Sequence, residues 1–390
     1  MKVDLKYNFF YIAAFLVDGG IGVLTIAVPL LAIRMNASPL ILGFTGFFFS
    51  LFYLSFSPLF GKLSDRVGLD DRTRAFPFTV IGCIILLFSA TFFPFSSSFA
   101  HIFILMGLTG IGMAMFWSPL EVWITKTSDD LLKSLSLFNV FWCAGISVGS
   151  LISGILFQIN WHFPFLFIGI FYLAAIFFLY RCPRVSSTQI FHNVEDGKEK
   201  RVKDFFLHIG WIANFIAWFG IGILRYLFPK LAVTLGITPF MIGVLMFLLG
   251  ATQSLIFYIM GHTSGWQHRL NFLILMQLVM CGGFLILCFS SSLFLFFPAF
   301  ILFGAGVGVS YFSSLYYSLE SKYEKGERSG IHELIVGAGG LVGPLLGGIA
   351  AQHFSLRAPF ILCIAIMIGG IVLEKNIVKR NEKKRLLQFS

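Results

Sequence analysis

Residues 21–43 read IGVLTIAVPLLAIRMNASPLILG, and residues 221–243 read IGILRYLFPKLAVTLGITPFMIG. The two stretches align without a gap and are identical at 8 of 23 positions. The identities include two prolines and two glycines, which a shared apolar composition alone would not produce. The sequence therefore predicts two related halves, offset by about 200 residues.

The chain is too apolar for a soluble protein. It is 57% hydrophobic and 12% charged, whereas a soluble domain carries about 25% charged residues. Apolar runs of about 18 or more residues recur along it, long enough to cross a bilayer as helices. Residues 81–93 and 293–303 lack the alternation of a membrane barrel strand. We expect an all-α polytopic membrane protein with twelve transmembrane helices, near 8–33, 39–60, 75–95, 100–124, 135–158, 162–181, 206–229, 239–260, 269–289, 292–318, 331–353 and 356–375.

The basic residues predict the orientation of these helices. Of the 28 Lys and Arg residues, 24 fall in the two chain ends and in every second connection. Cytoplasmic loops carry such an excess, so both termini are expected in the cytoplasm of a multi-pass protein of the cell (inner) membrane. The same placement explains the net charge of +10 without a nucleic-acid partner.

The repeat predicts how the chain is divided. An offset that spans an even number of helices gives both halves the same orientation. We expect an N-terminal six-helix bundle (1–181), a cytoplasmic linker (182–205) and a C-terminal six-helix bundle with a basic tail (206–390). Parallel repeats of this kind enclose a cavity and rock against each other to alternate access, which predicts transport.

The segment after the second span strengthens this prediction. Residues 61–68 read GKLSDRVG and residues 69–74 read LDDRTR. They resemble the signature loop of the major facilitator superfamily, G-x-L-x-D-R-x-G-R-R, although 69–71 stand where that family has basic residues. The resemblance implies a twelve-span transporter fold, no cofactor, and a gating loop made of Gly61, Asp65, Arg66, Gly68 and Arg72.

Glycines line one face of the fifth and eleventh spans. Small residues at this spacing let helix backbones approach closely. The fifth-span pattern resembles the glycine-rich motif of the family's proton-coupled drug exporters, with Ser150 in place of proline, and the fuller GPLLGG stands in the eleventh span. The expected helix-packing residues are Gly145, Gly149, Gly154, Gly339, Gly343, Pro344 and Gly347.

Few charged residues fall within the predicted spans. Asp18 is the only acid that the predicted spans place near mid-bilayer, where an ionised Asp costs roughly 2.5–3.5 kcal/mol. A carboxyl that changes protonation as its surroundings change from dry to wet can carry a proton, so Asp18, Glu121 and Glu333 are proton-coupling candidates. Glu333 is expected in the first turn of its span. Arg225 is the deep cation; it could bind an anionic group, pair with Asp18, or extend to the outer surface.

Polar and aromatic residues of the central spans predict a cavity for amphipathic or lipophilic cargo. Each could instead join two helices by a hydrogen bond. Besides Arg225, the candidates are Trp117, Asn139, Trp142, Asn214, Trp218, Gln253, Tyr258, Gln277, Tyr311 and Tyr317.

Together these features predict a secondary transporter that exports a small organic molecule in exchange for protons. The expected partners are that molecule, protons and the bilayer, with the chain acting as a monomer. A proton symporter or facilitator for uptake is the alternative within the class. An integral membrane enzyme is the alternative outside it, but no cluster of His, Cys and acids supports a catalytic or metal centre.

Overall fold

The computed structural model describes residues 8–67, 72–126, 131–181, 197–320 and 325–387. Within these ranges, the surroundings of side chains 8, 64–67, 72–77, 118–119, 121–126, 131, 197–204, 325–327 and 381–387 are not described.

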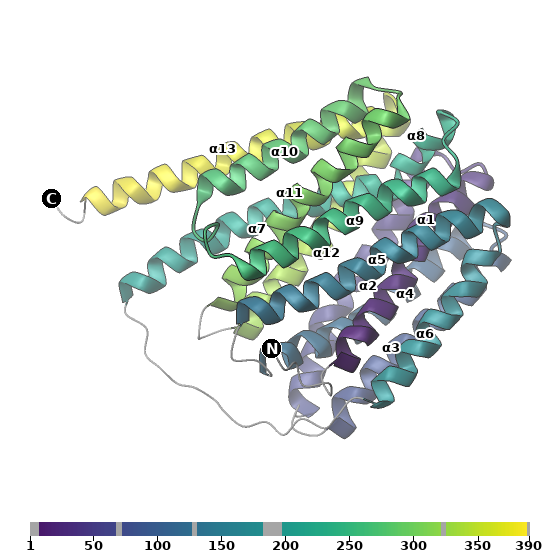
Figure 1. Cartoon of the computed structure of the whole chain (residues 1–390), viewed down its shortest axis with the longest axis horizontal. Helices are drawn as coiled ribbons and strands as arrows, with labels where there is room; N and C mark the ends of the chain where they lie inside the picture. The colour runs from purple at the N-terminus through teal and green to yellow at the C-terminus, as the bar shows by residue number, and fades with distance from the viewer. Residues whose placement is uncertain (1–7, 68–71, 127–130, 182–196, 321–324, 388–390) are drawn as a thin grey trace.

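The described chain is all-helical, as predicted, and its helices run side by side (Figure 1). In the first half they are α1 (Asn8–Arg34), α2 (Pro39–Val67), α3 (Arg72–Phe92) with the short helix η2 (Phe93–Phe95), α4 (Phe99–Lys126), α5 (Leu131–Ile159) and α6 (Phe163–Arg181). In the second half they are α7 (Gly197–Tyr226), α8 (Phe228–Thr234), α9 (Pro239–His262), α10 (Leu270–Phe289), α11 (Leu293–Glu320), α12 (Lys325–His353) and α13 (Ala358–Leu387).

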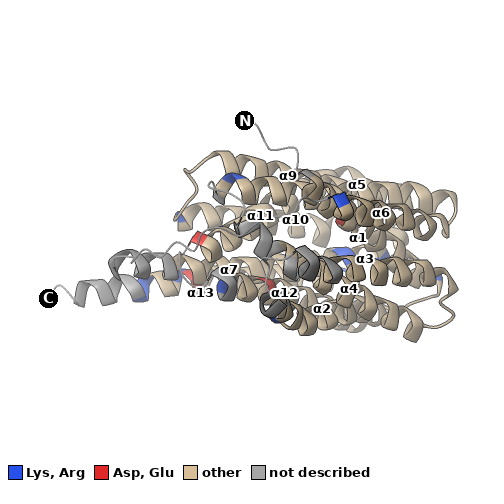
Figure 2. Ribbon diagram, turned by 90° about the horizontal axis from the view of Figure 1, so that it is seen from below, with Lys and Arg blue, Asp and Glu red and all other residues tan. Residues whose placement is uncertain are grey.

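Twelve segments of the described chain are long and apolar enough to span a membrane, which agrees with the predicted number. Charged residues are sparse along them (Figure 2). Helices α7 and α8 form one span, interrupted at Leu227. Pro229, in the first turn of α8, contributes to the interruption, because proline has no N–H to donate to the carbonyl four residues before it. An even number of spans puts both chain ends on one face, here called the terminal face; the opposite face is the distal face.

The internal repeat reappears in the backbone. Asn36 and Gly236, exactly equivalent at an offset of 200, both have positive φ, of 64° and 73°. After each, a backbone N–H donates across the turn, from Ala37 to the Ala32 carbonyl and from Ile237 to the Ala232 carbonyl, both at 2.9 Å. Each turn is a helix C-cap in which a left-handed residue satisfies the last free carbonyls. The two halves therefore share a turn conformation as well as a sequence pattern.

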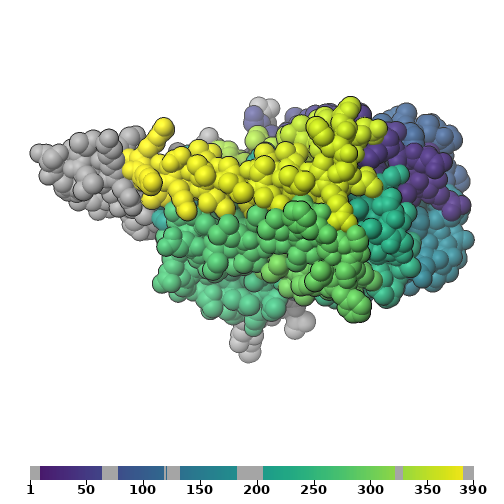
Figure 3. All heavy atoms as spheres, turned by 90° about the horizontal axis from the view of Figure 1, so that it is seen from above, coloured from purple at the N-terminus to yellow at the C-terminus, as the bar shows by residue number. Residues whose placement is uncertain are grey.

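Helices α1 and α7 lie at the centre of the molecule. The most apolar window of each is largely enclosed by protein, 89% for α1 and 72% for the span containing α7. The outer helices α3, α6, α10 and α13 instead expose large apolar side chains, such as Leu166, Leu278 and Ile361. Figure 3 shows α13 lying along the surface of the second half. Lipid-facing helices thus surround two central ones, and the residues of α1 and α7 are those that meet the interior.

Glycines bring helix backbones into contact within each half. A Cβ at Gly149 of α5 would collide with the carbonyl oxygen of Gly19 of α1, and one at Gly145 with that of Phe15. In the second half, Gly343 of α12 meets the carbonyl oxygen of Phe219 of α7 in the same way. The remaining predicted packing positions also face neighbouring helices: Gly154 meets α9, Gly339 meets α7, Gly347 meets α7 and Leu227, and the Pro344 ring meets Gly46 and Gly222.

Two long helix contacts connect the first half to the second, α5 with α9 and α2 with α12. Along α5, the Ser136 hydroxyl donates to the Phe257 carbonyl at 2.9 Å. Between α2 and α12, Gly43 lies against the backbone of Pro344 and Gly348. On the distal face, the Lys230 ammonium donates to the Ala37 carbonyl at 3.0 Å.

Several helices extend beyond the predicted spans, among them α2, α7, α12 and α13. Helix α12 begins at Lys325 rather than at 331, and α13 continues to Leu387 rather than ending at 375. Their outer turns are polar and therefore fall below the hydropathy of a span although they are helical. The division into bundles at 182–205 stays a prediction; residues 182–196 lie outside the described part, and the α7 backbone begins at Gly197.

The glycine contacts predict how alanine substitutions act. Gly149→Ala and Gly343→Ala each place a methyl group against a backbone oxygen, and overpacking of this kind costs about 1–3 kcal/mol. Gly369→Ala is the matched control, because among the described residues no side chain and no backbone of another helix lies within 4 Å of its Cβ position. In reversible unfolding in mixed detergent micelles, we expect the first two variants to lose stability and the third to keep or gain it. Equal stability of all three would show that the contacts do not hold the helices.

Candidate functional site

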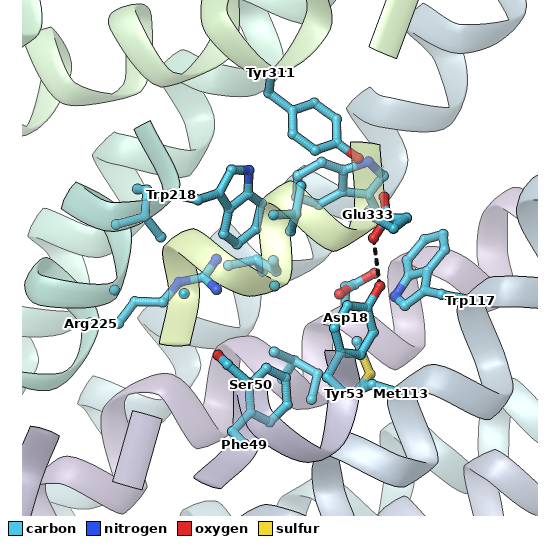
Figure 4. Close-up of a pocket in the computed structure, with 18 of the residues that line it drawn as sticks. Asp18, Phe49, Ser50, Tyr53, Met113, Trp117, Trp218, Arg225, Tyr311 and Glu333 are labelled. Atoms are coloured by element: carbon cyan, nitrogen blue, oxygen red, sulfur yellow. Dashed lines mark hydrogen bonds between the residues drawn. The ribbon is translucent and has the colours of Figure 1, made fainter. Parts of the chain in front are cut away.

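A cavity lies between the two halves near the middle of the helices (Figure 4). Including its mouth, it holds about 800 Å³ of space not occupied by atoms. Its lining comes from α1, α2, α4 and α5 of the first half and from α7, α11 and α12 of the second. No single half could therefore form it.

Asp18 lies on α1 inside this cavity. The residue is 3% exposed, and its Oδ2 atom has no hydrogen-bond partner among the described residues. Its position depends on the small residues that follow: a Cβ at Gly19 would meet the Phe171 ring, and one at Gly20 the Tyr172 ring, both of α6. The prediction that Asp18 is deeply buried is met, and the structure adds that its carboxylate faces an open space.

Arg225 enters the cavity from α7. In the view of Figure 4, Arg225 and Asp18 reach the site from opposite sides. The guanidinium carbon lies 5.3 Å from the centre of the Trp218 ring, a cation–π contact. No carboxylate of the described residues lies within 4 Å of it, so Arg225 forms no direct ion pair with Asp18, although the two charges attract across the cavity. Of the predicted alternatives, extension to the outer surface is not what the structure shows.

Glu333 lies in the cavity as well, and the predicted first-turn position is wrong. Because α12 begins at Lys325, Glu333 stands in the third turn. The Tyr53 hydroxyl of α2 donates to its Oε2 at 2.6 Å (Figure 4). This hydrogen bond connects the first half of the chain to the second beside the cavity. Asp18 is thus not the only acid at this depth.

His332, next to Glu333, was missed as a site residue. It is fully buried, with Nδ1 2.8 Å from the Ser314 hydroxyl and 3.4 Å from the Asn214 amide nitrogen. Its Nε2 lies 3.8 Å from a Glu333 oxygen. A histidine followed by a glutamate inside a long apolar helix was the available signal. The pair matched no complete metal motif, so no role followed from the sequence.

Aromatic side chains form much of the wall. Trp117, Trp142, Trp218 and Tyr311 all line the cavity, as predicted. Trp142 of α5 and Tyr311 of α11 meet edge to face with ring centres 5.3 Å apart, again across the two halves. The sequence did not indicate the α2 residues Phe49, Ser50 and Tyr53, nor Met113 and Tyr226.

The other predicted cavity residues lie elsewhere. Asn139 accepts a hydrogen bond from the Trp142 indole at 2.8 Å, and so orients a wall residue. Asn214 contacts His332 as described above, and Gln253 lines a smaller neighbouring cavity that Arg225 also borders. Gln277 donates to Glu374 of α13 at 2.8 Å, and both are fully buried.

Two tyrosines also lie outside the cavity. Tyr258 is 54% exposed on the outer surface of α9. Tyr317 lies near the end of α11 at the terminal face, where its hydroxyl oxygen accepts a hydrogen bond from the His268 backbone N–H. Polarity alone could not separate these residues from cavity residues, because the face that each presents depends on helix rotation. Several predicted site residues lie outside the described part: Gly68, and the side chains of Asp65, Arg66, Arg72 and Glu121. Gly61 is described, and no described residue of another element lies within 4 Å of its Cβ position.

Twelve spanning helices around a cavity shared by two repeated halves define a polytopic membrane transporter. The chain matches the family model of the Major Facilitator Superfamily over residues 10–321 and again over residues 210–386. The chain belongs to this superfamily. Proteins of this superfamily are secondary transporters of small solutes rather than enzymes.

Individual relatives are distant. The chain is 32% identical to a lactose permease of Citrobacter freundii over 132 residues, 32% of this chain, and 28% identical to the multidrug efflux protein YfmO of Bacillus subtilis (strain 168) over 160 residues, 40% of this chain. It spans only 31% and 38% of the length of these two relatives. The solved structure of the human organic anion transporter MFSD10 (TETRAN) is similar in fold, with a TM-score of 0.70 and 16% identity over 94% of this chain and 98% of that one.

The hydrogen bond between Tyr53 and Glu333 predicts an energetic coupling. Tyr53→Phe and Glu333→Gln both weaken the same bond, and a hydrogen bond to a charged group contributes about 1.5–3 kcal/mol. In a double-mutant cycle of unfolding free energies, the double variant should be about as stable as the less stable of the two single variants. Ser55→Ala on α2 is the control, because that hydroxyl bonds only within its own helix. Additive losses for Tyr53 and Glu333 would contradict the coupling.

Proposed function

We propose that this transporter exports a small organic molecule in exchange for protons. The observation that carries the proposal is Asp18, a buried acid in the shared cavity with an oxygen that has no hydrogen-bond partner. Such a carboxyl is stable in protonated form when the cavity is closed and dry, and it releases the proton when water enters. Alternating access supplies these two environments in turn.

Protonation of Glu333 would change the contact between α2 and α12. The Tyr53 hydroxyl donates to a charged acceptor while Glu333 is ionised, and charged hydrogen bonds are about twice as strong as neutral ones. Protonation of Glu333 would weaken the connection between α2 and α12 and so favour their separation. His332, fixed by Ser314, has its Nε2 3.8 Å from a Glu333 oxygen and borders the carboxylate without a hydrogen bond to it.

Other predicted parts of the mechanism rest on the sequence. The loop residues Gly61, Asp65, Arg66, Gly68 and Arg72 remain proposed gating residues through their resemblance to the family signature. Glu121 remains a proposed proton exit near the terminal face. The exporter assignment is supported by the spacing of Gly145, Gly149 and Gly154, which resembles the glycine-rich motif of the family's proton-coupled drug exporters.

The direction of transport has support on both sides. The multidrug efflux protein YfmO and the aromatic wall favour export of a lipophilic compound. The likeness to a lactose permease favours the second candidate, proton-driven uptake. The charge pattern of the loops supports a protein of the cell (inner) membrane with both termini in the cytoplasm.

Vesicles with an imposed pH gradient separate these mechanisms. With the full chain in proteoliposomes and ethidium, norfloxacin and lactose as probes, antiport predicts accumulation in vesicles that are acidic inside. Proton symport predicts accumulation in vesicles that are acidic outside. Asp18→Asn should reduce the driven accumulation at least tenfold, because it removes the proton-carrying group. Glu374→Gln, a buried acid outside the cavity, is the control and should leave transport unchanged.

Equal accumulation by wild type and Asp18→Asn would show that Asp18 is not the coupling group. Accumulation in vesicles that are acidic outside would contradict export and support proton-driven uptake. Accumulation without any gradient dependence would contradict proton coupling itself.

Reporter fusions test the orientation. Because the terminal face carries most of the basic residues, a fluorescent protein fused after Ser390 should fluoresce in the cytoplasm. Alkaline phosphatase fused at the same position, which folds only outside the cytoplasm, should be inactive. The reverse pair of results would overturn the proposed topology.

A further inference from the structure

The cavity presents two charges that the protein does not pair. Asp18 is 3% exposed and has an oxygen without a donor among the described residues. Among the described residues, Arg225 has no carboxylate within 4 Å, and its contact is with the face of Trp218. Glu333 differs from both, because Tyr53 already donates to it. A ligand would therefore meet one unmatched negative group and one unmatched positive group.

A neighbouring polar atom strengthens this asymmetry. The indole N–H of Trp218 is buried and has no acceptor among the described residues. It lies on the side chain whose ring contacts Arg225, so two N–H donor groups of α7 stand together in the cavity. The first half offers the Asp18 carboxylate, an acceptor. Since an unpaired buried polar group costs free energy, a ligand that supplies the missing partners is favoured over one that does not.

The space between the two charges suits a flat apolar body. Trp142, Tyr311 and Trp218 form a connected aromatic wall, with ring centres 5.3 Å apart for the first pair and 6.1 Å for the second. The Trp142 N–H is already bonded to Asn139, so this ring offers the cavity apolar surface. Trp117 from α4 adds a further indole to the lining. Aromatic walls of this kind bind planar ligands by stacking and edge contacts.

We propose that the transported solute is a zwitterion with a flat apolar body, its cationic group bound by Asp18 and its anionic group by Arg225 and the Trp218 N–H. The inference rests on the proposed function in one respect, that this cavity is the transport site. It also makes the solute cation and the proton compete for one carboxylate. That competition is the physical requirement for exchanging one against the other.

A matched set of four ligands tests the proposal: 4-(aminomethyl)benzoate, 4-methylbenzylamine, 4-methylbenzoate and 4-methylbenzyl alcohol. They share a ring and nearly the same size but are zwitterionic, cationic, anionic and neutral. Binding to the purified full chain in detergent micelles is measured by tryptophan fluorescence, without any gradient. We expect the zwitterion to bind at least tenfold more tightly than each of the other three.

Two variants assign the ends of the ligand. Asp18→Asn should remove the preference for the zwitterion over 4-methylbenzoate, and Arg225→Gln should remove its preference over 4-methylbenzylamine. Glu374→Gln, outside the cavity, should leave the order of affinities unchanged.

Equal affinity for all four ligands, tighter binding of the alcohol, or no binding of any of them at millimolar concentration would overturn the proposal. The outcome is separable from that of proton coupling. If Asp18→Asn abolishes gradient-driven transport but the four ligands bind equally, the coupling role stands and the substrate class is wrong. If the order of affinities is as expected but transport does not depend on the gradient, the substrate class stands and the coupling role is wrong.

Discussion

Close contact between helix backbones at glycine is the constraint on which this structure depends. Lipid is as apolar as the helix surfaces, so helices associate through packing rather than through release of water. Helix α1 contacts α5 where Gly149 meets the carbonyl of Gly19, and α7 contacts α12 where Gly343 meets that of Phe219. Asp18 and Trp218 each stand one residue before these contacts. The positions of the cavity groups are therefore determined by where the backbones touch.

The two halves share a backbone arrangement but differ in chemistry. At the offset of 200, Asp18 corresponds to Trp218 and Thr25 corresponds to Arg225, so one half supplies the acid and the other the cation. The inter-half contacts differ in the same way. Tyr53 corresponds to Gln253, and Glu333 corresponds to Asn139 at the offset of 194 that relates Gly339 to Gly145. An ionisable pair joins α2 to α12, whereas neutral amides occupy the equivalent positions on α9 and α5. A change of protonation therefore acts on one of the two contacts.

The fold could be predicted from sequence because its signals are long and redundant. Apolar runs predicted the number of spans, and the matched prolines and glycines predicted the repeat, to which the structure adds the equivalent turns at Asn36 and Gly236. The site was harder. Deep charges such as Asp18 and Arg225 stand out in an apolar chain, since burying them is costly. Tyr53 and His332 do not stand out, because their roles arise from contacts with residues on other helices, Glu333 for Tyr53 and Ser314 and Asn214 for His332. Tyr258 and Gln277 were misplaced because the rotation of each helix is set by packing that no local pattern records.

Lys230 has a consequence for the distal face. Its ammonium group is bound to the carbonyl of Ala37 in the turn that follows α1, close to the end of a helix, where free carbonyls concentrate partial negative charge. The contact joins the second half to the first close to the surrounding fluid. An attraction of this kind is weakened by dissolved ions, with a screening length of about 8 Å at physiological ionic strength. The salinity of the medium on that side therefore enters directly into how firmly the two halves are held together there.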